Sequence, residues 1–119
     1  MRFNNFKINE FRCPCCGMNK IQYSFVTKLD KARDISGIPY TINSGYACPE
    51  HNLARGGVPN SSHVLGLGCD ISCVTNIARM KIVQGLIMIG FTRIGIYPNH
   101  IHVDADESKP TPRMWLEAL

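Results

Sequence analysis

The side chains best suited to metal chemistry lie in a short segment near the end of the chain, where polar and apolar residues alternate. The polar positions are His100, His102, Asp104 and Asp106, and the apolar positions between them are Ile101, Val103 and Ala105. Because successive side chains of a strand point to opposite faces of a sheet, this alternation predicts a strand with one polar face. That face would present imidazoles and carboxylates, which are common zinc ligands.

A second segment offers further ligands. Leu67 to Ser72 is also predicted to be a strand, with Asp70 on its polar face, and His63 precedes it at the end of a loop. Gly66 and Gly68 would let a substrate backbone come close to these side chains. Two histidines and one carboxylate from this group would bind zinc and leave a fourth position for a water molecule, whose lowered pKa makes it a nucleophile.

The motif Ser61-x-His63-x-x-Gly66-x-x-x-Asp70, with His102-Val103-Asp104 downstream, resembles the zinc D-alanyl-D-alanine peptidase family. That family includes D-alanyl-D-alanine carboxypeptidases and phage L-alanyl-D-glutamate endopeptidases. Further matching pieces are Asn9-Glu10-Phe11 with Cys13, Ser44-Gly45-Tyr46 with Cys48-Pro49-Glu50-His51-Asn52, and Gly95-Ile96-Tyr97. The resemblance therefore covers nearly the whole chain.

The resemblance implies a zinc ion bound by His63, Asp70 and His102. It also implies the α+β fold shared with the hedgehog signalling domain, and the stem peptide of peptidoglycan as the substrate. Ser61 and Tyr46 would hold polar groups of that substrate. Asp104 would orient a zinc-binding histidine, unless it is an ordinary exposed carboxylate of a strand.

The chain departs from the family pattern at two positions. Asn99 stands where many relatives have an acidic general base, and we expect His100 to move protons in its place. Ala47 stands where relatives commonly carry an arginine that steadies the substrate. Without that charge, an enzyme that cuts inside the stem peptide is favoured over one that binds a free C-terminal carboxylate. Arg55 or Arg93 could restore the charge by folding over the site.

The elements that must position these residues follow from periodicity and turn signals. We predict helices from Ile21 to Ser36, capped by Asn19, from Asn76 to Gly90, and from Met114 to Leu119; strands at Tyr40–Tyr46, Leu67–Ser72, Arg93–Tyr97 and His100–Asp106; and a loop with one helical turn over residues 47–62. His51 is interpreted as a surface residue of that loop. This mixture predicts one α+β domain spanning residues 1–119, with a small antiparallel sheet and helices packed on one face.

Composition limits the classes of partner. The chain has 119 residues and a net charge of +4, and its basic residues are scattered, so we expect no nucleic-acid partner. The longest apolar stretch is far shorter than the roughly 20 residues of a membrane span. The first residues lack the apolar core of a secretory signal. We therefore expect a monomer made in the cytoplasm that acts at the cell wall after release, or as part of a phage particle.

Six cysteines are present, and two pairs have spacings that occur in zinc sites. Cys13 and Cys16 are separated by two residues, as in a zinc knuckle, and Cys69 and Cys73 by three. Cys69 lies on the apolar face of a predicted strand. We therefore expect reduced, packed thiols and no second zinc site.

The sequence thus predicts a zinc-dependent peptidase that hydrolyses peptidoglycan stem peptides. Two alternatives remain: a zinc-binding module that binds the wall without catalysis, and a structural part of a virus particle. Asn99 and Ala47 would fit the loss of catalysis, because a fold can persist after its chemistry is gone. His100 favours the enzyme, since an inactive site would not need it.

Overall fold

The computed structural model describes residues 3–117, and within them five strands form one sheet in the order β1-β2-β4-β3-β5. The strands are β1 (Ile42–Ser44), β2 (Gly68–Ser72), β3 (Arg93–Ile96), β4 (His100–Asp104) and β5 (Arg113–Leu116); the helices are the 3₁₀ turn η1 (Ile8–Phe11), α1 (Tyr23–Ser36), α2 (Pro49–Ala54) and α3 (Asn76–Ile89). All neighbouring strands are antiparallel except β3 and β5, which are parallel. The four predicted strands are all present, with shorter ends.

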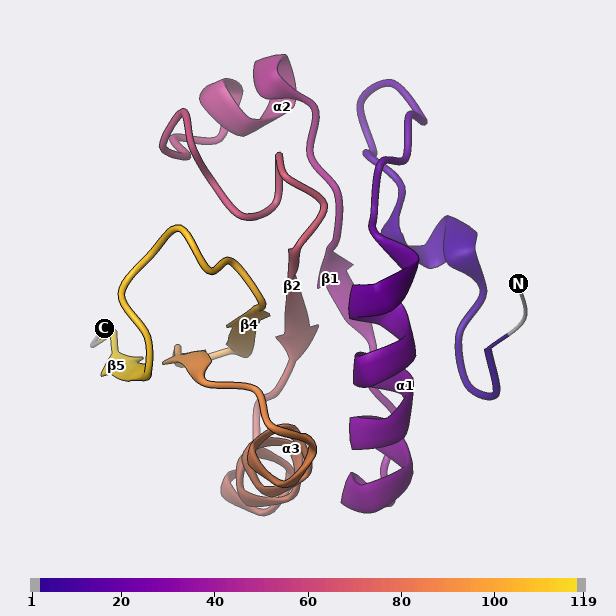
Figure 1. Ribbon diagram of the computed structural model, residues 1–119, viewed down its shortest axis with the longest axis vertical. Coiled ribbons are helices and arrows are strands. Elements are labelled where there is room, and N and C mark those ends of the chain that lie inside the picture. Colours follow the sequence, from indigo (N-terminus) through magenta and orange to yellow (C-terminus); the bar gives the residue numbers. More distant parts are fainter. Residues whose placement is uncertain (1–2, 118–119) are drawn as a thin grey trace.

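The two long helices, α1 and α3, contact each other and cover the same side of the sheet (Figure 1). Strands and helices contribute to one core, whose fully buried members include Val26, Leu29, Ile71, Ile82, Leu86, Ile101 and Val103. The opposite face of β2 and β4 carries the polar side chains. This arrangement confirms the predicted α+β fold and the alternation that placed Ile101 and Val103 inside.

The helix predicted to begin near Ile21 starts two residues later, at Tyr23, and ends at Ser36 as predicted. Asn19 is not its cap, which corrects the prediction. Its side-chain oxygen accepts a hydrogen bond from the backbone N–H of Ile21 (3.1 Å), and its amide nitrogen donates to the carbonyl of Ile8 (2.8 Å). Asn19 therefore fixes the turn before the helix and ties it to η1.

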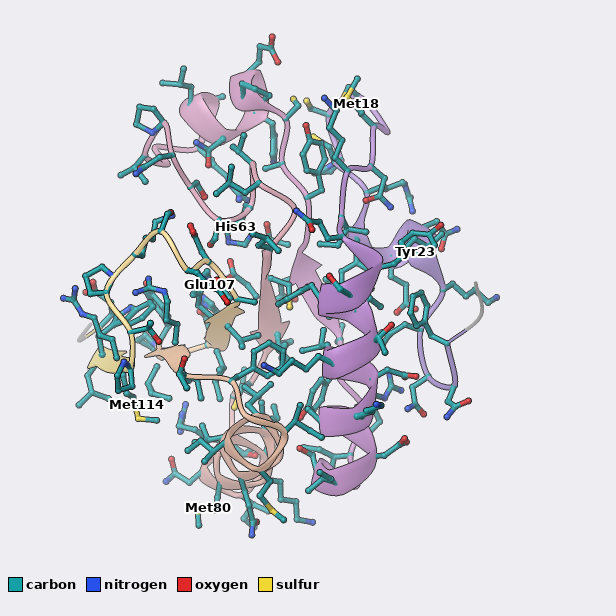
Figure 2. All side chains as sticks on the ribbon, in the orientation of Figure 1. Met18, Tyr23, His63, Met80, Glu107 and Met114 are labelled. Atoms are coloured by element: carbon teal, nitrogen blue, oxygen red, sulfur yellow. The ribbon has the colours of Figure 1, made fainter. Side chains whose placement is uncertain are left out.

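The buried face of α3 also differs from the prediction, although the bounds of the helix agree. The predicted face was Ile77, Met80, Val83, Leu86 and Ile87, whereas the structure buries Ile82, Gly85 and Leu86 and exposes Ile77, Met80, Ile87 and Met88. Met80 lies on the outer side of the helix in Figure 2. The sequence pattern does not identify the buried face, because apolar residues of α3 itself occupy most of its circumference.

Gly85 decides which face of α3 turns inward. A Cβ atom at this position would lie 2.1 Å from the hydroxyl oxygen of Ser36 on α1. Only a glycine lets the two helices approach this closely, so the side of α3 that carries Gly85 must face α1.

Within residues 3–117, none of the helices combines the length and apolar character that a membrane span requires.

The helix predicted over Met114–Leu119 is wrong for the residues that the structure describes, because Met114 to Leu116 lie in β5 and Glu117 is not helical; Ala118 and Leu119 lie outside the described residues. The backbone N–H of Arg113 donates to the carbonyl of Thr92 (2.7 Å), and that of Glu117 donates to Ile96 (2.8 Å). Without this strand, the outer edge of β3 would expose unpaired backbone groups. Pairing with that edge outweighs the local helical preference of the segment.

Candidate metal centre and active site

Three potential metal ligands meet on the polar face of the sheet. Asp70 on β2 lies directly opposite His102 on β4 in the strand register, and His63 reaches both from the loop before β2. Nδ1 of His102 and Nε2 of His63 lie 3.0 Å and 3.4 Å from Oδ1 of Asp70. Nitrogen and oxygen ligands of a tetrahedral zinc ion are about 3.3 Å apart. These donors therefore fit three corners of a zinc site and leave the fourth open.

Both histidines are held by a hydrogen bond at the ring nitrogen that faces away from the centre. Nδ1 of His63 lies 2.8 Å from the carbonyl oxygen of Gly45, which leaves its Nε2 facing Asp70. Nε2 of His102 lies 2.7 Å from a carboxylate oxygen of Asp104, which leaves its Nδ1 facing Asp70. Such contacts orient each ring before a metal binds, with the other nitrogen toward Asp70. Figure 2 shows His63 between the loop that follows α2 and the end of the sheet.

Asp104 is buried and anchors the centre from behind. Its other carboxylate oxygen accepts a hydrogen bond from Nε of Arg93 at 2.7 Å, so the carboxylate has a partner on each side. Burial alone would raise the pKa of Asp104, but the hydrogen bonds from His102 and Arg93 lower it. Asp104 is therefore ionised and in contact with His102, and it is not the exposed strand carboxylate considered as the alternative.

The close contacts at the centre shift the pKa values of Asp70 and His102 in opposite directions. Burial raises the pKa of Asp70, but hydrogen bonds with His102 and His63 outweigh it and hold the pKa well below its usual range. Burial lowers the pKa of His102, but Asp104 and Asp70 outweigh it and raise the pKa to about 9. Two carboxylates thus flank His102, and they favour a positive charge on the ring or on an ion bound in its place.

The three residues line an open cavity of about 510 Å³ on the surface of the protein. Its other lining residues are Asn52, Arg55, Gly56, Gly57, Ser61, Tyr97, His100 and Trp115. They come from α2 and the loop after it, from β4 and the turn before it, and from β5. A cavity of this size holds a small ligand or a few residues of a peptide.

His100 lies in this cavity on the same face of β4 as His102. Its ring stacks on Tyr97, with the centroids 4.3 Å apart and the planes inclined by 10°. Nδ1 lies 2.8 Å from the side-chain oxygen of Asn99, which can only accept, so Nδ1 carries a hydrogen. In the neutral ring, Nε2 is then a proton acceptor, and it lies 4.0 Å from a carboxylate oxygen of Asp70.

Arg55 and Ser61 form the wall of the cavity opposite the sheet. Asn52 of α2 positions this wall, because its side-chain amide donates to the carbonyl of Val58 at 2.7 Å. Nη1 of Arg55 donates to the hydroxyl of Ser44 at 2.6 Å. Ser61 lies in the cavity as predicted, and its hydroxyl oxygen accepts from the backbone N–H of His63 at 3.2 Å.

Two aromatic residues of the cavity were not predicted. Trp115 lies beside His102, with ring centroids 5.7 Å apart, and its indole N–H donates to the hydroxyl of Tyr97 at 3.1 Å. Gly95 on β3 makes room for the indole, because a Cβ atom there would lie 2.6 Å from the ring. Trp115 is the only tryptophan of the chain, and this was the signal that could have drawn attention to it.

Several predicted contributions to the site do not fit the structure. Tyr46 is 2% exposed and does not line the cavity, so it is not placed to touch a substrate. Gly66 and Gly68 are buried and do not floor the cavity; Cβ atoms at these positions would meet the backbone of Lys20 and the side chain of Ser62. Asp106 is buried beyond the end of β4, where it pairs with Lys109.

Two other predictions about charge and exposure can be compared with the structure. Of the two arginines considered as a replacement for the missing charge at Ala47, Arg55 lines the cavity, whereas Arg93 is buried against Asp104. His51 lies on α2, is partly exposed and does not line the cavity.

Comparison with known proteins gives one finding that bears on this site. The family model described as Peptidase M15 matches residues 4–104, which include His63, Asp70, His100 and His102. The comparison with curated proteins finds no match. The matched range covers the cavity except for the part contributed by β5.

Proposed function

This chain belongs to the peptidase M15 family, and we propose that it is a zinc-dependent peptidase that hydrolyses the stem peptides of peptidoglycan. The observation that carries the proposal is the meeting of His63, Asp70 and His102 in a cavity that also holds His100. Three ligands with an open fourth position are typical of catalytic rather than structural zinc. An extra histidine beside them supplies a group for proton transfer.

The metal would be held by Nε2 of His63, a carboxylate oxygen of Asp70 and Nδ1 of His102, the three donor atoms that face one another. When bound there, zinc supplies Lewis-acid polarisation of the scissile carbonyl and makes water a nucleophile near neutral pH. Asp104 keeps the second ring nitrogen of His102 engaged, so the ring is oriented before binding.

His100 is the residue that we propose for proton transfer. Its Nε2 takes a proton from the attacking water and later gives it to the nitrogen of the leaving amine. Asn99 cannot act as a base itself, but its side-chain oxygen fixes the tautomer in which Nε2 is the acceptor. Stacking on Tyr97 holds the imidazole plane in place. The substitution of an acid by Asn99 is therefore compatible with catalysis.

Arg55 and Ser61 are the residues that we propose for substrate binding. Arg55 is exposed at the end of α2 and lines the cavity, where its guanidinium would turn from Ser44 to bind a carboxylate of the stem peptide. The hydroxyl of Ser61 accepts from His63 and keeps its own hydrogen for a substrate carbonyl. This assignment replaces Tyr46, whose burial keeps it from the substrate.

The proposal is tested by incubating purified peptidoglycan with the zinc-loaded protein and identifying the released peptides by mass spectrometry. We expect stem-peptide fragments from the native protein and none from His102→Ala. His51→Ala is a matched control, because His51 does not line the cavity, and it should remain active. If the native protein binds zinc and peptidoglycan but releases no peptide, the catalytic proposal fails and a binding module is the better description.

A further inference from the structure

Four cysteine side chains gather between the turn after η1 and the start of α2. Cys13, Cys15 and Cys16 come from the turn after η1, and Cys48 comes from the residue that precedes α2. Their sulfur atoms all lie within 4.8 Å of one another. The turn is the one that Met18 marks in Figure 2.

The spacing of the sulfur atoms is that of a metal site rather than of a disulfide. The Sγ atom of Cys15 lies 3.6 Å from that of Cys13 and 3.4 Å from that of Cys48. Thiolates at about 2.3 Å from a tetrahedral zinc ion are separated by about 3.8 Å. A disulfide would need sulfur atoms about 2 Å apart, and all four cysteines are free thiols.

The backbone around the cluster is arranged to hold sulfur ligands. The N–H of Cys48 donates to Sγ of Cys13, and the N–H of His51 donates to Sγ of Cys48, both at 3.4 Å. Hydrogen bonds of this kind favour the ionised form of a thiol, which is the form that binds a metal. The turn is closed by bonds from Gly17 to the carbonyl of Cys13 and from Cys13 to the carbonyl of Met18.

The exposure of the four side chains shows how a metal could enter. Cys13 and Cys48 are buried, whereas Cys15 and Cys16 are exposed. Two ligands are thus fixed within the protein, and two lie at the surface, where they can close over an incoming ion. Exposed, adjacent free thiols are otherwise an unusual surface feature, because they are readily oxidised.

We propose that Cys13, Cys15, Cys16 and Cys48 bind a structural zinc ion, separate from the ion at His63, Asp70 and His102. Four thiolates fill the coordination shell of zinc and leave no position for water, which excludes a catalytic role at this site. This differs from the expectation of packed thiols drawn from the sequence. That expectation covered all six cysteines; it fits Cys69 and Cys73, which are buried and lie outside the cluster, but not the exposed Cys15 and Cys16.

The position of the cluster suggests that the ion would stabilise the backbone segment that contacts His63. Residues 45–48 run between the four sulfur atoms and His63. In this segment the carbonyl of Gly45 accepts from Nδ1 of His63, and the N–H of Ala47 donates to the carbonyl of His63 at 3.3 Å. An ion held by Cys48 at the end of this segment would therefore fix the contacts that orient His63.

The segment is also joined to the turn that carries the other three ligands. The N–H of Tyr46 donates to the carbonyl of Phe11 at 2.7 Å. A Cβ atom at Gly45 would lie 2.6 Å from the Cα atom of Phe11, so the two backbones are in close contact. The ion would thus join the amino-terminal part of the chain to the backbone of the active site, through ligands far apart in sequence.

Metal analysis of the purified protein tests the proposal. We expect two zinc ions per chain in the native protein and one in the Cys15→Ser/Cys16→Ser variant, whose substitutions lie on the surface. His63→Ala/His102→Ala should also retain one, which separates a failure of this proposal from a failure of the proposed catalytic site. Cys73→Ser is the matched control, because Cys73 lies outside the cluster, and it should retain both ions.

Cobalt substitution of the unaltered protein gives a readout that does not depend on the folding of any variant. Cobalt bound by thiolates shows an intense sulfur-to-metal charge-transfer absorption, which cobalt bound only by histidine and carboxylate lacks. We expect this band in the native protein and in His63→Ala/His102→Ala. Absence of the band from the native protein, a single zinc ion that Cys15→Ser/Cys16→Ser retains, or a disulfide within the cluster would each overturn the proposal.

Discussion

His102 shows how the residues of the centre prepare it for a metal. The ring lies between Asp70 and Asp104, at 3.0 Å and 2.7 Å, and these two carboxylates raise its pKa to about 9. Without a metal, a proton therefore occupies Nδ1 at neutral pH. Because zinc must take the same nitrogen, the metal and the proton compete for it.

This competition predicts how zinc affinity depends on pH. Below its pKa, His102 is protonated, and binding must release that proton, so the apparent affinity should rise about tenfold per pH unit up to about pH 9. For an ordinary histidine the rise would end near pH 6.5. The fluorescence of Trp115 reports this site, because the indole lies 5.7 Å from the imidazole. Zinc titrations followed by this signal at several pH values give the affinity.

The matched variant for this prediction is Asp104→Asn, which keeps the shape of the side chain but removes its charge. We expect the rise in affinity to end at a lower pH in this variant, since one of the two carboxylates that favour the protonated ring is lost. An affinity that levels off near pH 6.5 in the native protein would contradict the role given to the two carboxylates.

His100 should be needed for turnover but not for metal binding. Its Nε2 lies 4.0 Å from Asp70, and its Nδ1 is engaged by Asn99, so it is not one of the three donors that face one another. We expect His100→Ala to retain zinc and to lose about 10²- to 10⁴-fold in kcat, the usual contribution of a general acid–base group. Metal analysis and steady-state kinetics on a stem peptide measure both. Unchanged turnover would mean that another group transfers the proton.

For individual residues, the sequence was most informative where polar and apolar positions alternate regularly. Alternation along two strands was enough to place Asp70 and His102 on one face, because a strand fixes the direction of every second side chain. The family resemblance was misleading for Tyr46, which lies two residues beyond β1, is buried and does not line the cavity. Arg55 could be considered only as one of two candidates, since the path of a loop does not follow from periodicity.

At the scale of elements, the edge strand β5 completes the cavity. It pairs in parallel with β3, and this register places Trp115 next to Gly95. The indole lies against the glycine and beside His102, and Trp115 and His102 both line the cavity. The partner of β5 is β3, from which it is separated in sequence by β4 and a loop. Local sequence patterns do not detect such a distant pairing, and for this reason the segment was predicted to be a helix.

Replacing Gly95 by alanine should displace Trp115. The added Cβ would lie 2.6 Å from the ring, so the indole must move away from His102. We expect a loss of about 1–3 kcal/mol in the free energy of unfolding, as for other overpacked positions, and a change in tryptophan fluorescence. Urea unfolding of the variant measures the first effect, and its emission spectrum measures the second.

A double-mutant cycle separates this clash from a general effect of the substitution on β3. In the Trp115→Ala background, Gly95→Ala should cost much less than in the native protein, because the ring that it would strike is gone. Equal costs in both backgrounds would show that the close contact in the structure does not determine the effect.

At the scale of the whole molecule, the cavity is assembled from segments that are far apart in the chain. Asn52 to Ser61, His63, Asp70, His100 and Trp115 come together only when the sheet has formed and the loop after α2 has folded over it. The family resemblance and strand patterns were sufficient to predict the fold class and the meeting of His63, Asp70 and His102 on one face of the sheet. They could not predict the wall opposite the sheet, because its position depends on loop contacts such as Asn52 to Val58.

The position of Arg55 at the cavity predicts which bond of the stem peptide is cut. Ala47 is fully buried and carries no charge, whereas Arg55 approaches from the exposed end of α2. A carboxylate bound by Arg55 would lie at the edge of the cavity, as would the side-chain carboxylate of an extended peptide. We therefore expect cleavage of an L-alanyl-D-glutamate stem peptide in preference to one that ends in D-alanyl-D-alanine, when both are offered at equal concentration.

Arg55 should determine how tightly the preferred peptide binds. A hydrogen bond to a charged group contributes about 1.5–3 kcal/mol, so Arg55→Ala should raise KM by roughly ten- to a hundredfold and change kcat less. Arg55→Lys keeps the charge but not the two-pronged geometry, and we expect an intermediate KM. Steady-state kinetics on both peptides measures these effects. Cleavage of the D-alanyl-D-alanine peptide alone would reverse the proposed preference, and an unchanged KM in Arg55→Ala would show that the guanidinium does not bind the substrate.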